Sequence, residues 1–495
     1  MTLPSSSSPG CQGSQSVAQT VSGDTIRATG RVDAQHAMSR IGICHFRVGE
    51  TDGVSLEIEK WRAALEALGH TVYLCAGRAG DGEAFLIPEL SLDHPEVEKI
   101  RVNAFQTFAD YPSEEELHAH IEALAGRIER GLRHFVEVYD IDLLIVENIW
   151  SLSPHLPATL ALWRTVRDLK LPAIAHHHDF YWEKEDYRGP TCPLVRRLLA
   201  EYFPPRDPKI VHVVINRLAQ GELAKRGIPA VVVPNVLDFS TSPQLDEFNQ
   251  DLRERLGLSP RDVVLLQSTR VVRRKGIELA VDLAAELAQP GFQAALARRV
   301  REHGASGPAR VVLLLTNLVE DPLYWEQLQE HIARRGVEVR LATGQVAFRR
   351  REEAGRKIYS FWDTYLFADL MTYPSLQEGW GNQFLEGIWA KLPVASFEYP
   401  VFKTDIAPLG FKYVSLGDVV HTDGDGLRRV PAQVLRRAAR QAAELLSSPT
   451  RYREVVEHNH QLAKQHLSLT KLQQLLAGVV SRAVTAQGGG IVKGS

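Results

Sequence analysis

Short apolar runs alternate with amphipathic stretches along most of the chain. The first run, 41–46, is followed by helical periodicity over 55–68 and by a second apolar run over 71–76. Strand-length runs separated by helices are typical of parallel sheets, in which each helix is a crossover. Further strands are predicted at 143–146, 172–176, 211–215 and 230–233. We therefore expect a first doubly wound α/β domain that ends near Asn235.

The same alternation resumes after a charged connector. Helices are predicted over 276–288 and around 325–333, and strands at 263–267, 311–315, 338–341, 370–373 and 394–397. This pattern predicts a second doubly wound parallel sheet. Beyond Val430 the periodicity is helical to about Val484.

The chain length agrees with two domains. A chain of 495 residues exceeds what one hydrophobic core usually serves. The first residues are rich in Ser, Gly, Thr and Gln, which predicts a disordered extension. The predicted parts are an N-terminal extension, a first Rossmann-like domain, a connector, a second Rossmann-like domain, C-terminal helices and a flexible tail, at 1–38, 39–237, 238–257, 258–428, 429–486 and 487–495.

Charge and cysteine content narrow the classes of partner and compartment. A formal net charge of −3 gives no electrostatic case for binding nucleic acid. Two of the four cysteines lie in apolar runs, which favours buried thiols in a reducing cytoplasm. The sequence has neither a secretory signal nor eighteen consecutive apolar residues, so we expect a cytoplasmic protein without a transmembrane segment. Short basic runs at 349–351 and 196–197 leave peripheral contact with anionic lipid open, although such runs are usually solvated.

Two carboxylates, Glu378 and Glu386, lie eight positions apart in the stretch 373–395, which has the pattern loop, helix, strand. Asn382 is the predicted N-cap of a helix over 383–391. A helix start preceded by glycines favours a phosphate, because its free N–H groups and its dipole both attract anions. Glu386 lies about one turn further in and can accept hydrogen bonds from a ribose diol, while Glu378 can bind hydroxyls of a second sugar. The segment predicts a nucleotide-sugar site.

This segment resembles the E-x7-E signature of retaining glycosyltransferases with the GT-B fold, in particular glycosyltransferase family 4. The flanking stretches 367–375 and 389–395 are similar to the family's hydrophobic strand and to its Ala-x-Gly-x-Pro-Val segment, with Lys391 where glycine is common. The resemblance implies two Rossmann-like domains that face a cleft, an N-terminal acceptor domain at 39–237 and a C-terminal nucleotide-sugar domain at 258–428, with final helices that return to the first domain.

A second motif lies at 267–280 and resembles the family's Gly-Arg-x4-Lys-Gly segment. It places Arg270 and Lys275 at the matching basic positions, with Thr269 where glycine is usual. Two cations can stabilise the negative charge that develops on a departing diphosphate, so no metal ion or other cofactor is expected. Arg273 and Arg274 are interpreted as solvated loop charges.

In the first domain, the turn after the opening strand is a candidate acceptor or diphosphate loop. Gly49 and Gly53 let backbone approach a substrate, and Ser55 follows them at the helix start. Asn148 and Ser153 follow a later strand and either line the acceptor pocket or cap a helix.

The run 176–179, His-His-His-Asp, follows another predicted strand. His178 falls where the resemblance implies an active-site histidine that contacts the transferred sugar. A metal bound by the histidines with Asp179 and Glu183 is the weaker alternative, since strand alternation separates His177 from its neighbours. The Asp-Gly-Asp at 423–425 is interpreted as a solvated turn and not as a metal motif.

Together these motifs predict a metal-independent, retaining hexosyltransferase. The expected donor is an α-linked nucleotide sugar (GDP-mannose, UDP-glucose or ADP-glucose), and the expected acceptor is a hydroxyl of a small sugar, sugar phosphate or glycerate derivative. A sugar-nucleotide epimerase and a non-catalytic sugar-nucleotide-binding protein are the alternatives. The expected catalytic residues are Arg270, Lys275, Glu378 and His178, and the expected donor-binding residues are Gly379, Trp380, Gly381, Asn382 and Glu386.

Overall fold

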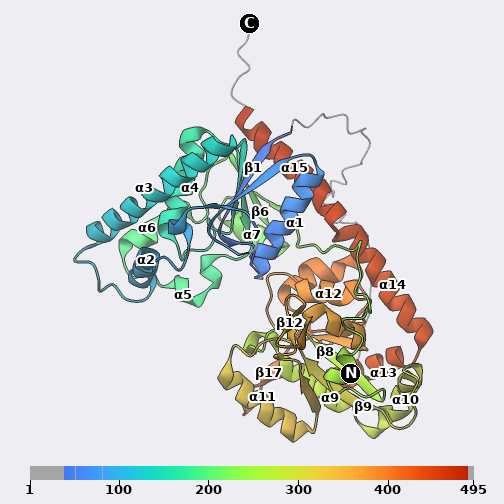
Figure 1. The fold of residues 1–495 in the computed structure, drawn as a ribbon. Coiled ribbons are helices and arrows are strands. Elements are labelled where there is room, and N and C mark those ends of the chain that lie inside the picture. The colour runs from blue at the N-terminus through green and yellow to red at the C-terminus, as the bar shows by residue number, and fades with distance from the viewer. Residues whose placement is uncertain (1–37, 51, 81, 489–495) are drawn as a thin grey trace, which may run out of the picture. The chain divides into compact units, whose positions relative to one another are not determined.

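The computed structural model describes residues 38–50, 52–80 and 82–488 (Figure 1). Most of the predicted N-terminal extension, Cys11 and most of the predicted C-terminal tail lie outside these ranges. Two parallel sheets, each with helices packed against it, account for the bulk of the described chain, as the alternation of apolar runs predicts.

The first sheet has seven parallel strands in the order β3-β2-β1-β4-β5-β6-β7. The strands are β1 (Arg40–Val48), β2 (Thr71–Ala79), β3 (Phe85–Leu86), β4 (Leu143–Glu147), β5 (Ala173–His177), β6 (Ile210–Val214) and β7 (Ala230–Val232). The helices of this part are α1 (Gly53–Ala67), α2 (Pro95–Phe105), α3 (Glu114–Tyr139), α4 (Leu156–Leu169), α5 (Glu185–Arg188), α6 (Pro193–Tyr202) and α7 (Arg217–Lys225), with 3-10 turns η1 (Pro88–Leu90) and η2 (Tyr181–Glu183).

Helices cover both faces of this sheet, because alternate strand residues point to opposite sides. On one face, Cys44 and Val146 pack with α2, α3, α4 and α6. On the other face, Ile43 and Ile145 pack with α1 and with the last helix of the chain. The strands are therefore buried on both sides, which explains their nearly continuous apolar runs.

The second sheet has six parallel strands in the order β10-β9-β8-β14-β15-β16. The strands are β8 (Asp262–Gln267), β9 (Arg310–Leu315), β10 (Glu338–Leu341), β14 (Leu370–Tyr373), β15 (Val394–Ser396) and β16 (Val414–Ser415). Around it lie α8 (Leu252–Arg255), α9 (Ile277–Leu287), α10 (Gln293–Glu302), α11 (Pro322–Arg335), α12 (Asn382–Trp389) and the short turns η3 (Arg273–Lys275), η4 (Pro290–Phe292), η5 (Phe361–Phe367), η6 (Phe402–Ile406) and η7 (Ala407–Leu409).

Two small sheets lie outside the predicted pattern. One has three strands, β11 (Val346–Ala347), β12 (Arg351–Glu353) and β13 (Arg356–Ser360), and the other is the hairpin of β17 (His421–Thr422) and β18 (Arg428–Arg429). The second contains the predicted turn at 423–425, where Asp425 pairs with Arg334 and Arg429. These ion pairs account for the Asp-Gly-Asp as a structural turn.

The three C-terminal helices are α13 (Ala432–Leu446), α14 (Pro449–His466) and α15 (Leu469–Gly488). The apolar residues of α13 belong to the core around the second sheet, as does Ala463 of α14. Only α15 packs on the first sheet, where Leu476 and Val480 contact the layer that contains Ile41 and Ile43. Figure 1 shows α15 beside α1. The return to the first domain is therefore made by one helix and not by the whole segment 429–486.

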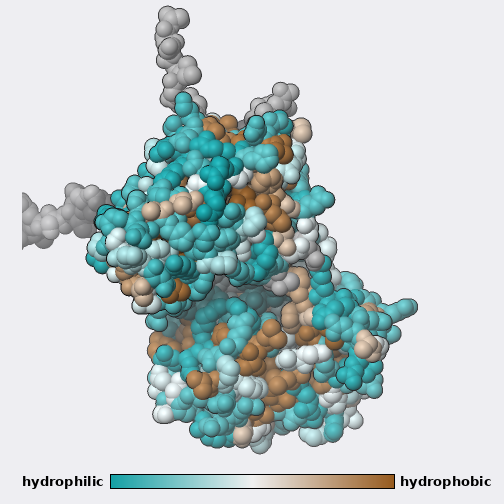
Figure 2. Space-filling model, turned by 60° about the vertical axis from the view of Figure 1, so that its left-hand side comes forward, coloured by the Kyte–Doolittle hydropathy of each residue, from teal (hydrophilic) through white to brown (hydrophobic). Residues whose placement is uncertain are grey.

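The pairing of the basic run 349–351 bears on the peripheral membrane alternative. No helix in the described part of the chain is long and apolar enough to cross a membrane. Hydrophilic residues cover most of the face in Figure 2, with hydrophobic residues in separate patches. In the basic run 349–351, Arg350 pairs with Asp363 and Asp246, and Arg351 pairs with Glu353. These carboxylates neutralise charge that anionic lipid would otherwise attract.

Candidate active site

The predicted motifs lie where the strand order of a sheet reverses. In the second sheet, β8 lies between β9 and β14. The chain continues from β8 to β9 on one side, whereas β14 lies on the other side, so the strand order reverses between β8 and β14. The basic motif follows β8, and the segment with the two glutamates follows β14. In the first sheet, β1 and β4 are the corresponding pair. Such carboxyl-terminal edges are where open α/β sheets bind ligands.

Helix α12 begins one residue earlier than predicted. Gly381 is the N-cap and Asn382 is the first helical residue, so the prediction of Asn382 as the cap was wrong. The Asn382 side chain instead accepts a hydrogen bond of 3.0 Å from the Asn235 amide. A Cβ atom on Gly381 would lie 2.7 Å from Ile406 Cδ1, which explains why glycine stands there. The helix start is thus fixed by close packing and not by a side-chain cap.

Glu378 forms the central ion-pair cluster of the motif. Its Oε1 accepts a hydrogen bond from Lys275 Nζ, and its Oε2 lies 2.9 Å from Arg274 Nη1. Lys275 is buried, and burial lowers its pKa against the opposing attraction of Glu378. The Arg274 side chain is 43% exposed, as expected for a solvated charge, and its guanidinium also binds the same carboxylate. The structure brings the two sequence motifs together at this carboxylate.

Arg270 has a different partner. Its Nη1 lies 2.9 Å from both carboxylate oxygens of Glu320, and both side chains are exposed. Glu320 follows β9, the strand next to β8, and carries no sequence signal of its own. Arg270 therefore lies in the basic loop after β8 but outside the Glu378 contact.

Glu386 lies on α12 and is bound by a tyrosine that the motif did not indicate. Tyr365 Oη donates to Glu386 Oε2 at 2.6 Å, and the Ser268 hydroxyl lies 2.9 Å from the same tyrosine oxygen. Burial raises the pKa of Glu386, and the Tyr365 hydrogen bond opposes that increase. Tyr365 belongs to η5, which precedes β14, so a sequence motif centred on 373–395 cannot contain it.

Trp380 has a buried environment. It belongs to the core around the second sheet, and its backbone oxygen accepts a hydrogen bond of 2.5 Å from Tyr399 Oη. Its indole N–H is buried and has no partner among the described residues. Packing therefore shields the indole N–H of Trp380 from a donor molecule.

The turn after β1 supplies a helix cap. Asp52 accepts from the backbone N–H groups of Val54 and Ser55, and Ser55 Oγ donates to Asp52 at 2.7 Å. Gly49 adopts a positive φ of 67°, and Gly53 is exposed with open space around it. The Ser55 hydroxyl therefore serves the cap, whereas Gly53 leaves room at the start of α1.

Asn148 organises the loop that holds His178. It adopts a positive φ of 57° after β4, and its side-chain oxygen accepts from the backbone N–H of His178 at 3.0 Å. The Ser151 hydroxyl donates to the same oxygen at 2.9 Å. Ser153 is buried, and its hydroxyl has no partner among the described residues. Asn148 thus connects the ends of β4 and β5.

The three consecutive histidines separate as strand alternation predicts. His177 points away from its neighbours and lies 3.0 Å from His212, whereas His176 and His178 share a face with Glu147. Asp179 pairs with Lys184, and the Glu183 carboxylate accepts from the backbone of Phe180. The metal set considered from sequence is therefore not assembled. Glu147 was missed, although it ends the strand next to the histidines.

The loop after β6 in the first domain contacts the segment that follows Glu378. The Asn216 amide donates to the backbone oxygen of Gly379 at 2.8 Å. A Cβ atom on Gly379 would lie 3.4 Å from Ile215 Cδ1 and 3.6 Å from the backbone oxygen of His178. His178 and the start of the donor-binding segment are thus neighbours.

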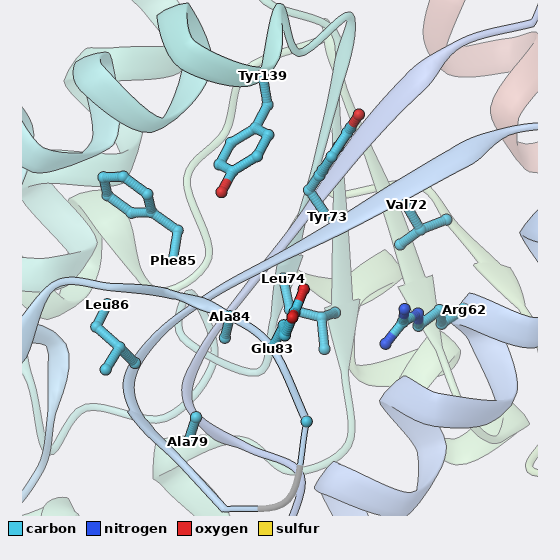
Figure 3. Close-up of a pocket in the computed structure, with 11 residues that line it drawn as sticks. Arg62, Val72, Tyr73, Leu74, Ala79, Glu83, Ala84, Phe85, Leu86 and Tyr139 are labelled. Carbon is cyan, nitrogen blue, oxygen red and sulfur yellow. The ribbon is translucent and has the colours of Figure 1, made fainter.

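A pocket of about 550 Å³ lies elsewhere, at the β2–β3 edge of the first sheet (Figure 3). Tyr73, Phe85 and Tyr139 supply its aromatic side, and Arg62 and Glu83 supply charged groups. None of the predicted site residues lines it. Position in the fold, and not cavity size, therefore identifies the candidate site.

Known proteins similar in sequence decide the family. The chain is 39% identical over 436 residues to the mannosylglucosylglycerate synthase of Petrotoga mobilis, with 87% of this chain and 97% of that protein covered. It is 39% identical over 441 residues to the mannosylglucosylglycerate synthase of Thermotoga maritima, with 88% and 99% covered. The chain belongs to the mannosylglucosylglycerate synthase family. It is a glycosyltransferase. No family model matches the chain.

Solved structures show that this synthase-family chain has the GT-B fold. A glycosyltransferase from Rickettsia africae matches with a TM-score of 0.57 at 12% identity, covering 91% of this chain and 99% of that one. Anabaena HepE in complex with UDP and glucose matches with a TM-score of 0.54 at 14% identity, covering 90% and 99%. Membership of the synthase family favours the glycosyltransferase prediction over the epimerase and the non-catalytic alternatives.

Proposed function

We propose that the protein transfers a mannosyl group from a nucleotide-activated mannose to a hydroxyl of glucosylglycerate. The names of the two relatives describe a product built from mannose, glucose and glycerate. A single transfer that completes this product adds mannose to glucosylglycerate. A glycerate derivative is among the acceptors that the sequence motifs predict, and a mannose nucleotide is among the donors.

The observation that carries the proposal is the shared contact of the two motifs. Lys275 and Arg274, from the segment after β8, bind the Glu378 carboxylate, from the segment after β14. Helix α12 begins four residues after Glu378 at the same edge of the sheet. A diphosphate at this edge meets two cations and a helix start, both of which favour negative charge.

We infer roles for the other residues from the same arrangement. Glu386 binds the ribose, Glu378 binds the transferred sugar, and the backbone over 379–382 contacts the sugar and the phosphates. Lys275 and Arg270 stabilise the departing diphosphate, with Arg274 as a third cation. On this assignment the chain belongs to glycosyltransferase family 4, and Glu378 and Glu386 are the ends of its E-x7-E signature.

We further propose that transfer retains the anomeric configuration and needs no metal. The lysine and arginine side chains supply the positive charge that a metal would otherwise bring to the leaving group. Attack on the sugar face from which the diphosphate departs lets that diphosphate accept the proton of the acceptor hydroxyl.

Three buried cysteines without disulfide bonds support a reducing compartment for this reaction. Cys44, Cys75 and Cys192 are buried and free. Thiols persist in this form in the cytoplasm, where disulfides are rare. We propose a cytoplasmic location on this basis.

The ribose role is tested by Glu386→Gln with titration of GDP, UDP and ADP by calorimetry. We expect the best nucleotide to bind the variant about 10-fold or more weakly, because hydrogen bonds to a charged group contribute about 1.5–3 kcal/mol. Glu457→Gln is the matched control, since Glu457 is an exposed glutamate paired with Lys391. Equal nucleotide affinity in wild type and Glu386→Gln would remove the ribose role.

A further inference from the structure

Glu147 receives two histidines on one face of the first sheet. Glu147 and His176 are register partners on β4 and β5, and His178 lies two residues further on. His176 Nδ1 lies 2.9 Å from Glu147 Oε1, and His178 Nε2 is hydrogen bonded to the same oxygen. The carboxylate is almost fully buried. This arrangement stands at the switch point between β1 and β4, beside the proposed donor site.

The pKa values of the two imidazoles are shifted in opposite directions. Burial lowers the pKa of His176 despite the carboxylate, and its Nε2 is buried with no partner among the described residues. Burial also opposes the charge on His178, but Glu147 outweighs it and the pKa of His178 is raised. Burial would raise the pKa of Glu147, yet the two histidines lower it. One carboxylate therefore orients both rings, and it favours the charge on His178 more than the charge on His176.

The carboxylates around His178 favour the cation, and the neighbouring histidines oppose it. The titratable groups that act on it or on its partner carboxylate come from α1, β1, β5 and the residue after His178, and they are Glu57, His45, His176, His177 and Asp179. Two of these are carboxylates, while His45 lies 2.7 Å from the backbone oxygen of Glu147. Trp61 stacks on His176 with ring centroids 4.1 Å apart and shields it.

The second nitrogen of His178 is the group available to a substrate. Its Nε2 is occupied by Glu147, whereas none of the hydrogen bonds among the described residues uses its Nδ1. The side chain keeps about 7% exposure, in contrast to 1% for His176. A cationic imidazole carries a proton on each nitrogen, so Nδ1 can donate.

We propose that Glu147 is a positioning residue for glycosyl transfer: it holds His178 as a cation with Nε2–H on the carboxylate, so that Nδ1–H donates to an oxygen of the nucleotide sugar. This inference rests on the proposed function. The oxygens of the departing diphosphate become more negative as the bond to the sugar breaks. A hydrogen bond from a charged donor to such an oxygen becomes stronger, so it stabilises the transition state more than the ground state. Glu147 acts only through His178.

A metal site is the competing use of the same three side chains. Glu147, His176 and His178 offer ligand atoms that all lie within 4.8 Å of one another. His176 Nδ1 is, however, already hydrogen bonded to Glu147 Oε2 at 3.0 Å and His178 Nε2 to Glu147 Oε1, and a cation between them would break these hydrogen bonds. The geometry thus favours a proton, and not a metal, between the rings and the carboxylate.

The test compares wild type with Glu147→Gln in two measurements. The first is 15N NMR of histidine-labelled protein, with the His178 signals assigned by His178→Gln. It needs no substrate, so it remains informative if the proposed reaction is wrong. We expect His178 of the wild type to remain protonated above pH 6.5 and to lose its proton about one pH unit or more lower in Glu147→Gln.

The second measurement is the pH profile of transfer from GDP-mannose to glucosylglycerate. The protonated form of His178 is the active one, so turnover falls as pH rises through its pKa. In Glu147→Gln this decrease moves to lower pH, and kcat at pH 8 falls about 10-fold or more while KM for the donor changes less than about threefold. Glu147→Asp keeps the charge and recovers part of the wild-type profile.

Asp282→Asn is the matched control. Asp282 is a buried carboxylate that lies 2.9 Å from His331 in the second domain, outside the candidate site. Its loss removes a comparable buried pair without moving the pH profile. Two results would overturn the proposal: an unchanged His178 titration in Glu147→Gln, or a wild-type enzyme whose activity and melting temperature rise with added Zn²⁺ or Mn²⁺ and lose that response in the variant.

Discussion

At the scale of single residues, the account depends on a buried ion pair that connects two loops. Lys275 lies almost entirely out of solvent with Glu378 as its partner, and Arg274 bonds the other carboxylate oxygen. Buried charges of this kind are costly to desolvate, so stability alone is a weak reason for their presence. A role in binding a diphosphate gives the arrangement a chemical reason.

Lys275→Met tests that role, since methionine keeps the apolar stem and removes the charge. We expect kcat to fall about 100-fold or more, because a preorganised cation at a leaving group contributes on that scale. The measurement is release of nucleoside diphosphate with acceptor present. Lys403→Met is the control, as Lys403 is exposed and pairs with Asp418. Turnover of Lys275→Met within threefold of wild type would contradict the leaving-group assignment.

The sequence identified the residues within each motif but not their partners. Glu378, Glu386, Lys275 and His178 carry a motif because they follow strands at fixed spacing. Tyr365, Glu320 and Glu147 reach the site from other strands and turns, and only the folded sheet places them there. The exposure of Arg274 agrees with its interpretation as a solvated charge, but its contact with Glu378 was not predicted, because a basic loop residue gives no sign of which partner its side chain binds.

At the scale of elements, the loops after β8 and β14 are attached through their backbones. The backbone N–H of Leu376 donates to the Arg274 oxygen at 2.9 Å. Gly276 adopts a positive φ of 57°, and a Cβ atom there would lie 2.6 Å from the Pro374 oxygen. The absence of a side chain at Gly276 therefore allows the two loops to pack closely against each other.

The variant Gly276→Ala tests this close contact, and Gly336→Ala is its matched control. Gly336 adopts a similar φ of 62° at the end of α11, but nothing lies within 4 Å of its added Cβ. Alanine costs about 1 kcal/mol at either position for its backbone conformation. We expect Gly276→Ala to lower the free energy of unfolding, measured with urea, by at least about 1 kcal/mol more. Equal costs in the two variants would show that the loops do not need this close approach.

The predicted elements differ in how well the sequence specifies them. The central strands are buried on both faces, so their apolar runs are clear, and the prediction of two parallel sheets was confirmed. The strands β11, β12 and β13 are short and partly exposed, which leaves them no apolar pattern. Lys391 adopts a positive φ of 54° after α12, and this explains why the resembling family has glycine there.

At the scale of the whole molecule, two doubly wound sheets present their switch-point edges as candidate binding surfaces. The second sheet supplies the charged loop and helix start proposed for the nucleotide, and the first supplies His178 and the exposed Gly53. Helix α15 connects the C-terminal segment to the core of the first sheet. This division of the two candidate binding surfaces follows from the strand order. The proposed acceptor, in contrast, was chosen from the names of the relatives and not from the fold.

The most direct test of the central claim is NMR of the product formed from GDP-mannose and glucosylglycerate by the purified protein. The account predicts mannosylglucosylglycerate with an α-linked mannose, formed without added metal, together with one equivalent of GDP. UDP-glucose and ADP-glucose with the same acceptor are the matched reactions, and they should yield much less product. Absence of mannosyl transfer, or a β-linked mannose in the product, would contradict the account.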